Sequence, residues 1–367
     1  AEALPACVSE SIPAPTSTDL APDGELFDAV CAGASLRLFS TSGADVLHAA
    51  RDARRGARFA DVVTLVTGGR TGGADALAVG ATPWVAWRHE RRFSVGRAGE
   101  STTPVTASAE LPGSWRGAWL LSVTERQAWV ATTLDRPEGS LVVAMRLPID
   151  QGGDTLRVYS LGEGTIDAVI PGDTASLLVR RTQGRRHDFT CITATTAVLP
   201  VLALPGAPDD AGPPMGAIPE VSLQRTAAFT VEAERVTASP NGVGRNSDAR
   251  SFLLTEGADG VGAVTLLTYP PQGSPVGQAL VPRGSGVGLG ANGHGEAVAV
   301  VTEGPSTLLF TRVEGEAPTR ERTALRGVTR AMVLTCGDEP WVAFTASSPA
   351  RVAALPLVCL SRRALAR

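Results

Sequence analysis

A short apolar run recurs along this chain about every 45 residues. Its seven copies occupy residues 35–38, 83–86, 128–131, 176–179, 251–254, 297–300 and 340–343. Each copy is followed by a polar turn and a second β-like run, as in residues 141–147 after the turn at 136–139. A strand, a short turn and a second strand form a β-hairpin. The repeat therefore predicts an all-β array of similar units.

Two further runs complete each unit. An expected inner strand, usually with a small residue at its centre, precedes each hairpin at residues 28–30, 75–77, 117–119, 167–169, 227–229, 286–290 and 330–332. Expected outer strands lie at 61–67, 104–111, 156–161, 197–204, 278–282 and 320–325. Four short strands every 40 to 50 residues or so are typical of a β-propeller.

The chain thus resembles exported bacterial β-propeller proteins, in architecture only, because no WD-repeat, kelch or Asp-box signature is present. We expect seven blades of four antiparallel strands over residues 26–360, with an insertion around 205–250 that includes a loop at 237–250. Residues 1–25 form an N-terminal extension and 361–367 a C-terminal tail. Residues 44–58 are rich in Ala and Arg and could instead form a helix, which leaves a six-bladed ring as the alternative.

The last blade runs short of sequence after its third strand, expected at 352–359. Because an unpaired sheet edge invites aggregation, we expect residues 8–20 to supply the missing strand and close the ring. Closure would make the first and last blades neighbours.

The cysteines agree with this closure. Cys31 and Cys336 each lie five residues before the same repeat position, which predicts a Cys31–Cys336 disulfide. Cys7 would then pair with Cys359, leaving Cys191 as a buried thiol, whereas the alternative is a Cys336–Cys359 bond within the last blade. Either pairing indicates an oxidising compartment, so we expect a secreted, periplasmic or cell-surface protein.

Three carboxylates and one guanidinium open inner strands at matching positions: Asp28, Asp75, Asp167 and Arg330. At one mouth of a propeller channel, such carboxylates could bind calcium, orient a sugar, or act as acid and base. The alternative is that they only solvate the rim or pair with Arg330.

Two turns expected on the same face are basic, with Arg88 and Arg92 in one and Arg181 and Arg186 in the other. Guanidinium groups bind carboxylates, sulfates and phosphates, so these four residues are candidate ligand-binding residues. Turns of a propeller also carry charge merely because they face water.

Several function classes are disfavoured. All 33 basic residues are Arg, so lysine-dependent chemistry is absent. The 37 acidic residues outnumber them, which disfavours nucleic acid as a partner, and the apolar runs are too short to span a membrane as a helix. The histidines and cysteines show no metal-ligand spacing, and no cofactor is expected apart from the calcium considered above.

Two functions remain. The first is a non-catalytic exported propeller that binds a protein or glycan, or is a structural subunit of an extracellular assembly, since loops on a rigid scaffold usually carry binding residues. The alternative is a hydrolase or lyase that acts on a carbohydrate or lactone through Asp28, Asp75 or Asp167.

Overall fold

A computed structural model describes most of the repeat array. It covers residues 25–43, 45–52, 63–66, 74–89, 92–98, 105–110, 113–149, 157–170, 174–195, 224–233, 235–243, 251–257, 262–269, 276–291, 297–312, 317–336, 339–347 and 350–360.

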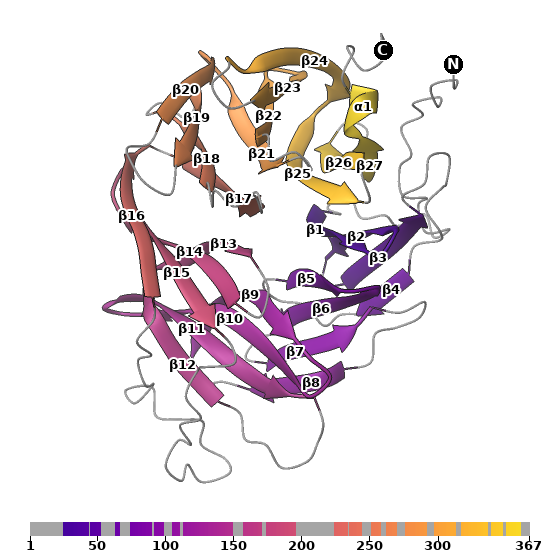
Figure 1. Cartoon of the computed structure of the whole chain (residues 1–367), viewed down its shortest axis with the longest axis vertical. Coiled ribbons are helices and arrows are strands. Elements are labelled where there is room, and N and C mark those ends of the chain that lie inside the picture. Colours follow the sequence, from indigo (N-terminus) through magenta and orange to yellow (C-terminus); the bar gives the residue numbers. More distant parts are fainter. Residues whose placement is uncertain are drawn as a thin grey trace. The chain divides into compact units, whose positions relative to one another are not determined.

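Seven antiparallel sheets follow one another along the chain (Figure 1). The first contains β1 (Glu25–Ala32), β2 (Ser35–Ser42), β3 (Asp45–Asp52) and β4 (Val63–Val66). The second contains β5 (Ala74–Val79), β6 (Thr82–His89), β7 (Arg92–Arg97) and β8 (Val105–Glu110). The third contains β9 (Ser114–Val123), β10 (Gln127–Arg136), β11 (Gly139–Pro148) and β12 (Arg157–Glu163). The fourth contains β13 (Thr165–Ile170), β14 (Thr174–Gln183), β15 (Arg186–Thr195) and β16 (Gln224–Glu232).

The remaining three sheets follow the same plan. The fifth contains β17 (Arg235–Val243), β18 (Ser251–Glu256), β19 (Val264–Tyr269) and β20 (Val276–Val281). The sixth contains β21 (Ser285–Ala291), β22 (Ala297–Glu303), β23 (Ser306–Arg312) and β24 (Thr319–Arg326). In the described residues the last sheet has three strands, β25 (Val328–Cys336), β26 (Glu339–Ser347) and β27 (Ala350–Pro356), before the short helix α1 (Leu357–Leu360).

These sheets are the blades of a seven-bladed β-propeller, as the repeat predicted. The six-bladed alternative is wrong because β3, which lies within residues 44–58, is a strand of a four-stranded blade. Middle strands such as β10 are covered on both faces: residues 128–134 are all buried. A strand with both faces covered reads as a continuous apolar run rather than an alternating one.

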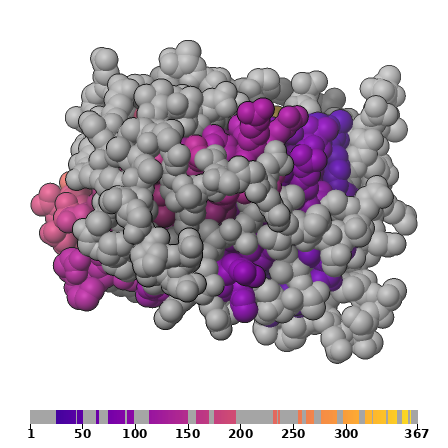
Figure 2. All heavy atoms as spheres, turned by 90° about the horizontal axis from the view of Figure 1, so that it is seen from below, coloured from indigo at the N-terminus to yellow at the C-terminus, as the bar shows by residue number. Residues whose placement is uncertain are grey.

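The chain divides into two compact units. The first comprises residues 1–43, 47–63 and 233–367, and the second residues 44–46 and 64–232. On the face shown in Figure 2, side chains of the second unit, coloured purple to pink, reach the surface.

In the first unit, the first and last blades pack together. Their shared apolar cluster includes Leu36 and Trp341, both fully buried. The Leu26 N–H donates a 2.8 Å hydrogen bond to Thr345 Oγ1. The predicted Cys31–Cys336 disulfide is confirmed, which rules out the Cys336–Cys359 alternative. Two other clusters in this unit join the fifth blade to the sixth and the sixth to the seventh.

In the second unit, two clusters join the second blade to the third and the third to the fourth. Trp84 and Trp129, which share a repeat position with Trp341, each lie in one of them and are 4% and 2% exposed. Their role is to fill the space between blades.

Several expected boundaries differ from the structure. Residues 227–229 belong to β16, the outer strand of the fourth blade, and the inner strand of the fifth blade is β17, which occupies part of the loop expected at 237–250. The long segment before β16 explains the error, because it delays the outer strand beyond its repeat position. Cys359 lies in α1 rather than in a strand, and Cys191 is half-buried rather than buried. Residues 1–24, including Cys7 and the expected closing strand, lie outside the described residues, as do 197–204 and 361–367.

Candidate functional site

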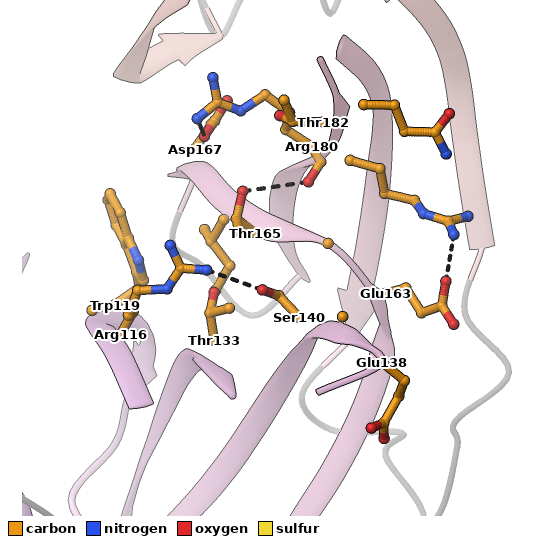
Figure 3. Close-up of a pocket in the computed structure, with 16 residues that line it drawn as sticks. Arg116, Trp119, Thr133, Glu138, Ser140, Glu163, Thr165, Asp167, Arg180 and Thr182 are labelled. Carbon is orange, nitrogen blue, oxygen red and sulfur yellow. Dashed lines mark hydrogen bonds and ion pairs between the residues drawn. The ribbon is translucent and has the colours of Figure 1, made fainter. Parts of the chain in front are cut away.

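A cavity of about 640 Å³ lies between the third and fourth blades, within the second unit (Figure 3). Its lining comes from β9, β10, the β10–β11 turn, β11, the end of β12, β13 and the end of β14. Pockets that hold small ligands commonly have volumes of about 300 to 1,000 Å³. We call this cavity the β9–β13 pocket.

Among the residues that the structure describes, four ion pairs lie in or beside the β9–β13 pocket. They are Arg116–Asp135 (2.7 Å), Arg136–Glu138 (3.4 Å), Arg180–Asp167 (3.0 Å) and Arg181–Glu163. Three of these guanidinium groups, those of Arg116, Arg180 and Arg181, belong to the lining. Each guanidinium is matched by one carboxylate, so the pocket carries many charges but little net charge.

Of the described residues that line the pocket, one is aromatic. Trp119 on β9 is half-buried and packs against the apolar cluster between the third and fourth blades. Gly117 has a φ of 73°, and a Cβ there would lie 2.9 Å from Trp119 Nε1, so only glycine leaves room for the indole. The buried Thr132 hydroxyl bonds to the carbonyl oxygens of Arg116 and Gly117, at 3.0 and 2.9 Å. This contact fixes the irregular backbone that presents Trp119.

A second glycine in the pocket lining joins the third blade to the fourth. Gly164 connects β12 to β13 at a φ of 133°, and its N–H donates a 2.8 Å hydrogen bond to the Ser140 carbonyl. A Cβ at Gly164 would lie 2.7 Å from both the Arg180 carbonyl oxygen and Val179 Cγ1. The close approach of β13 to β14 therefore depends on glycine at this position.

Asp167 is the most perturbed group in the pocket. Its side chain is 10% exposed, and burial raises its pKa to about 6, although the nearby Arg180 guanidinium partly opposes this shift. In the described part of the chain, Asp167 Oδ2 and Arg180 Nε are buried without a hydrogen-bond partner. Both atoms are enclosed by protein, although both residues belong to the lining and pair with each other there (Figure 3).

The other two carboxylates that were predicted with Asp167 at the channel mouth have different surroundings. Asp28, in the first unit, is 5% exposed and accepts a 2.7 Å hydrogen bond from the Ala29 N–H. Asp75 accepts a 2.6 Å hydrogen bond from the Leu120 N–H and so links the second blade to the third. Neither belongs to the lining of the β9–β13 pocket.

The predicted arginines are also dispersed. Arg181 on β14 lines the pocket, whereas Arg186 on β15 forms a 3.0 Å ion pair with Asp188 of the same strand. Arg88 and Arg92 flank the β6–β7 turn of the second blade. Arg330 contacts Glu25 at 3.4 Å and the Phe27 carbonyl at 3.2 Å, so its observed partners come from the first blade.

Sequence reasoning missed Trp119 and Arg116, although a signal for them exists. Three of the inner-strand runs read Asp-Ala-aliphatic, at residues 28–30, 75–77 and 167–169. The run at 117–119 reads Gly-Ala-Trp instead, with glycine in the aspartate position and tryptophan in the aliphatic one. The two residues at which this run departs from the repeat, Gly117 and Trp119, both line the pocket.

The structure also bears on metal binding and on membrane insertion. Among the described residues, no group of three or more His, Cys, Asp or Glu side chains is arranged to hold a metal ion. In the same residues, no helix has the length and apolar character needed to cross a bilayer.

Similarity to known proteins is confined to the fold. No family model matches this chain, and no curated protein matches it. The β-propeller domain of Cps50 (Swd1) from Myceliophteria thermophila is 11% identical, with a TM-score of 0.51 over 90% of this chain and 99% of that chain. The WD40 domain of Toxoplasma gondii coronin is 9% identical, with a TM-score of 0.53 over 90% and 80%. The polysaccharide lyase Uly1 is 10% identical, with a TM-score of 0.54 over 90% and 89%. At these identities the likeness shows a β-propeller module and no particular activity.

Proposed function

We propose that this chain is a non-catalytic propeller module that binds a glycan in the β9–β13 pocket. The observation that carries the proposal is the half-buried Trp119 ring in a pocket otherwise rich in ion-paired side chains. A sugar ring has an apolar face of C–H groups and a rim of hydroxyls. An aromatic ring offers a flat apolar surface to that face, and charged hydrogen-bonding groups match the rim.

The exposed charged groups of the lining support a hydroxyl-bearing ligand in particular. A hydroxyl group both donates and accepts hydrogen bonds. One hydroxyl could therefore donate to the Glu163 carboxylate and accept from the Arg181 guanidinium, which are both more than half exposed in the lining.

The direct test is a glycan array followed by calorimetry on the strongest binder. We expect Trp119→Leu to weaken binding at least tenfold, and Trp119→Phe to weaken it less because a flat aromatic face remains. Arg186→Gln is the control, because it removes an ion pair on the same blade outside the pocket lining. Equal affinity of the wild-type protein and Trp119→Leu would refute the proposal.

We also propose that the module works outside the reducing cytosol, as a secreted, periplasmic or cell-surface protein. The Cys31–Cys336 disulfide supports this location, since such bonds persist in oxidising compartments. Fractionation of the native cells, with the redox state of Cys31 read by thiol alkylation, tests it. Recovery of the chain in the cytosol with Cys31 reduced would contradict it.

A second candidate function is cleavage of the bound saccharide. Asp167 favours it, because a buried carboxyl with a raised pKa has the property required of a general acid. Mass spectrometry of an array-positive oligosaccharide after incubation with the protein would detect products. Products formed by the wild-type protein and lost in Asp167→Asn would establish catalysis, and an unchanged oligosaccharide would leave binding as the function.

A further inference from the structure

The β9–β13 pocket is longer than one sugar ring. On the third blade, Trp119 of β9 pairs with Ala131 of β10. The lining reaches Glu138 in the β10–β11 turn, which begins after Arg136. Arg136 lies five residues beyond Ala131 on β10. At about 3.4 Å per residue, the lining therefore extends about 17 Å along this blade.

The fourth blade gives a similar length. Ile166 in the lining pairs with Val179, and the lining continues along β14 as far as Gln183, four residues beyond Val179. The same rise per residue gives about 14 Å. With covalent bonds of about 1.5 Å, a pyranose ring measures roughly 5 to 6 Å from O1 to O4. Both walls are therefore long enough for at least two linked sugar units.

The two ends of the pocket offer different contacts. Trp119 and Glu163 lie at opposite sides of the cavity in Figure 3, with Thr165 between them. Glu163 forms an ion pair with Arg181, and both side chains are more than half exposed. A guanidinium has five N–H donors and a carboxylate has about four acceptor positions, so one ion pair occupies a small part of their hydrogen-bonding capacity. One end of the pocket is thus suited to the apolar face of a sugar and the other to its hydroxyl groups.

The described lining is balanced in charge. Its guanidinium groups are those of Arg116, Arg180 and Arg181, and its carboxylates are those of Glu138, Glu163 and Asp167. Equal numbers of the two charges provide no net electrostatic attraction for an anion or a cation. An uncharged ligand with many hydroxyl groups can form hydrogen bonds with both kinds of group without adding a charge that lacks a counterion.

We infer that the β9–β13 pocket takes a linear, uncharged oligosaccharide, with one ring on Trp119 and a later unit at the Glu163–Arg181 pair. This inference rests on the proposed function, because it names the class of glycan that the same site holds. A monosaccharide on Trp119 reaches only one end of the pocket. Covalent linkage places the later unit close to its own contacts, so affinity should rise with chain length.

The test is calorimetry of the full chain with cello-, manno-, galacto- and xylo-oligosaccharides, each series from the monosaccharide to the pentasaccharide. We expect the trisaccharide of a series that binds to have about tenfold or more the affinity of its monosaccharide. That affinity should be the same at low salt and at about 0.5 M sodium chloride, because salt screens interactions between charges and the ligand has none.

Variants distinguish the two ends of the pocket. Trp119→Leu should weaken the monosaccharide and the trisaccharide alike. Arg181→Gln should weaken the trisaccharide about fivefold, the loss expected for one hydrogen bond, and leave the monosaccharide unchanged. Arg186→Gln is the matched control, because Arg186 also forms an exposed ion pair on the fourth blade but lies outside the lining, and it should change neither affinity.

The outcomes separate the two proposals. Equal affinity for monosaccharide and trisaccharide, an equal effect of Arg181→Gln on both, or array binding confined to charged saccharides would overturn the inference and leave the saccharide-binding function standing. Failure of every sugar here and on the glycan array would overturn both.

Discussion

His48 should make the protein sensitive to mild acid. It lies on β3 with 3% of its surface exposed, and its ring stacks on Phe39 with centroids 4.9 Å apart. Within the described residues neither ring nitrogen has a hydrogen-bond partner. Burial, reinforced by the positive charge of Arg37, lowers its pKa from 6.5 to about 4.

The size of the pH effect on the free energy of unfolding follows from the linkage between protonation and folding. Between pH 6.5 and about pH 4 the unfolded chain binds a proton at His48 that the folded chain excludes, so the contribution of His48 to the free energy of unfolding falls as the pH is lowered. A difference of about 2.5 pKa units at 1.36 kcal/mol each gives a loss of about 3 kcal/mol. The stabilising contribution of neutral His48 is complete above pH 6.5 and is lost by pH 4.

Urea unfolding of the oxidised protein from pH 4 to pH 7.5 measures this effect. His48→Phe keeps a ring against Phe39 but cannot take up a proton. We expect its free energy of unfolding, relative to that of the wild type, to rise by about 3 kcal/mol as the pH falls from 7.5 to 4. His48→Gln is the matched variant, since it retains a buried polar group but does not titrate. At pH 7.5 His48→Gln should be less stable than His48→Phe, but its free energy of unfolding relative to the wild type should rise by the same amount as the pH falls to 4. A difference between wild type and both variants that stays constant with pH would refute the reasoning.

Three further predictions concern the disulfide and the pocket. Replacing Cys31 and Cys336 together by Ala should lower the free energy of unfolding by up to about 5 kcal/mol, since the bond spans 305 residues. Denaturant titration measures this loss, and an unchanged unfolding midpoint would contradict a stabilising role for the disulfide. Gly164→Ala should lower the melting temperature and weaken sugar binding, because its Cβ would clash with the Arg180 carbonyl oxygen. A melting temperature and an affinity equal to those of the wild type would show that β13 does not approach β14 closely at this position. Burial raises the pKa of Asp167 from 3.8 to about 6, so its contribution to the free energy of unfolding increases by about 3 kcal/mol as the pH falls from about 6 to 3.8. Asp167→Asn should lack this increase in the same urea assay. If the variant and the wild type showed parallel pH profiles, the assignment would be wrong.

The architecture was predictable because a propeller repeats its apolar pattern. Trp84, Trp129 and Trp341 occur at one repeat position and all lie between blades. The Cys31–Cys336 pairing followed from the same register, since equivalent positions of the first and last blades meet when those blades are neighbours.

The site was less predictable because a repeat describes what the blades share. Asp75 and Asp167 occupy matching positions, yet one bonds to a backbone N–H and the other to a guanidinium. Asp75 meets the Leu120 N–H of the neighbouring third blade, whereas Asp167 pairs with Arg180 of its own blade, so a shared repeat position does not decide the partner. The outer strand of the fourth blade was misplaced for a related reason, because β16 follows a segment longer than the repeat allows.

A crystal structure of the protein with its array-selected saccharide tests the central claim most directly. We expect a sugar ring stacked on Trp119, with oxygens of the ligand within hydrogen-bond distance of Arg181 or Glu163. A saccharide bound elsewhere on the chain, with no contact to Trp119, would contradict the proposal.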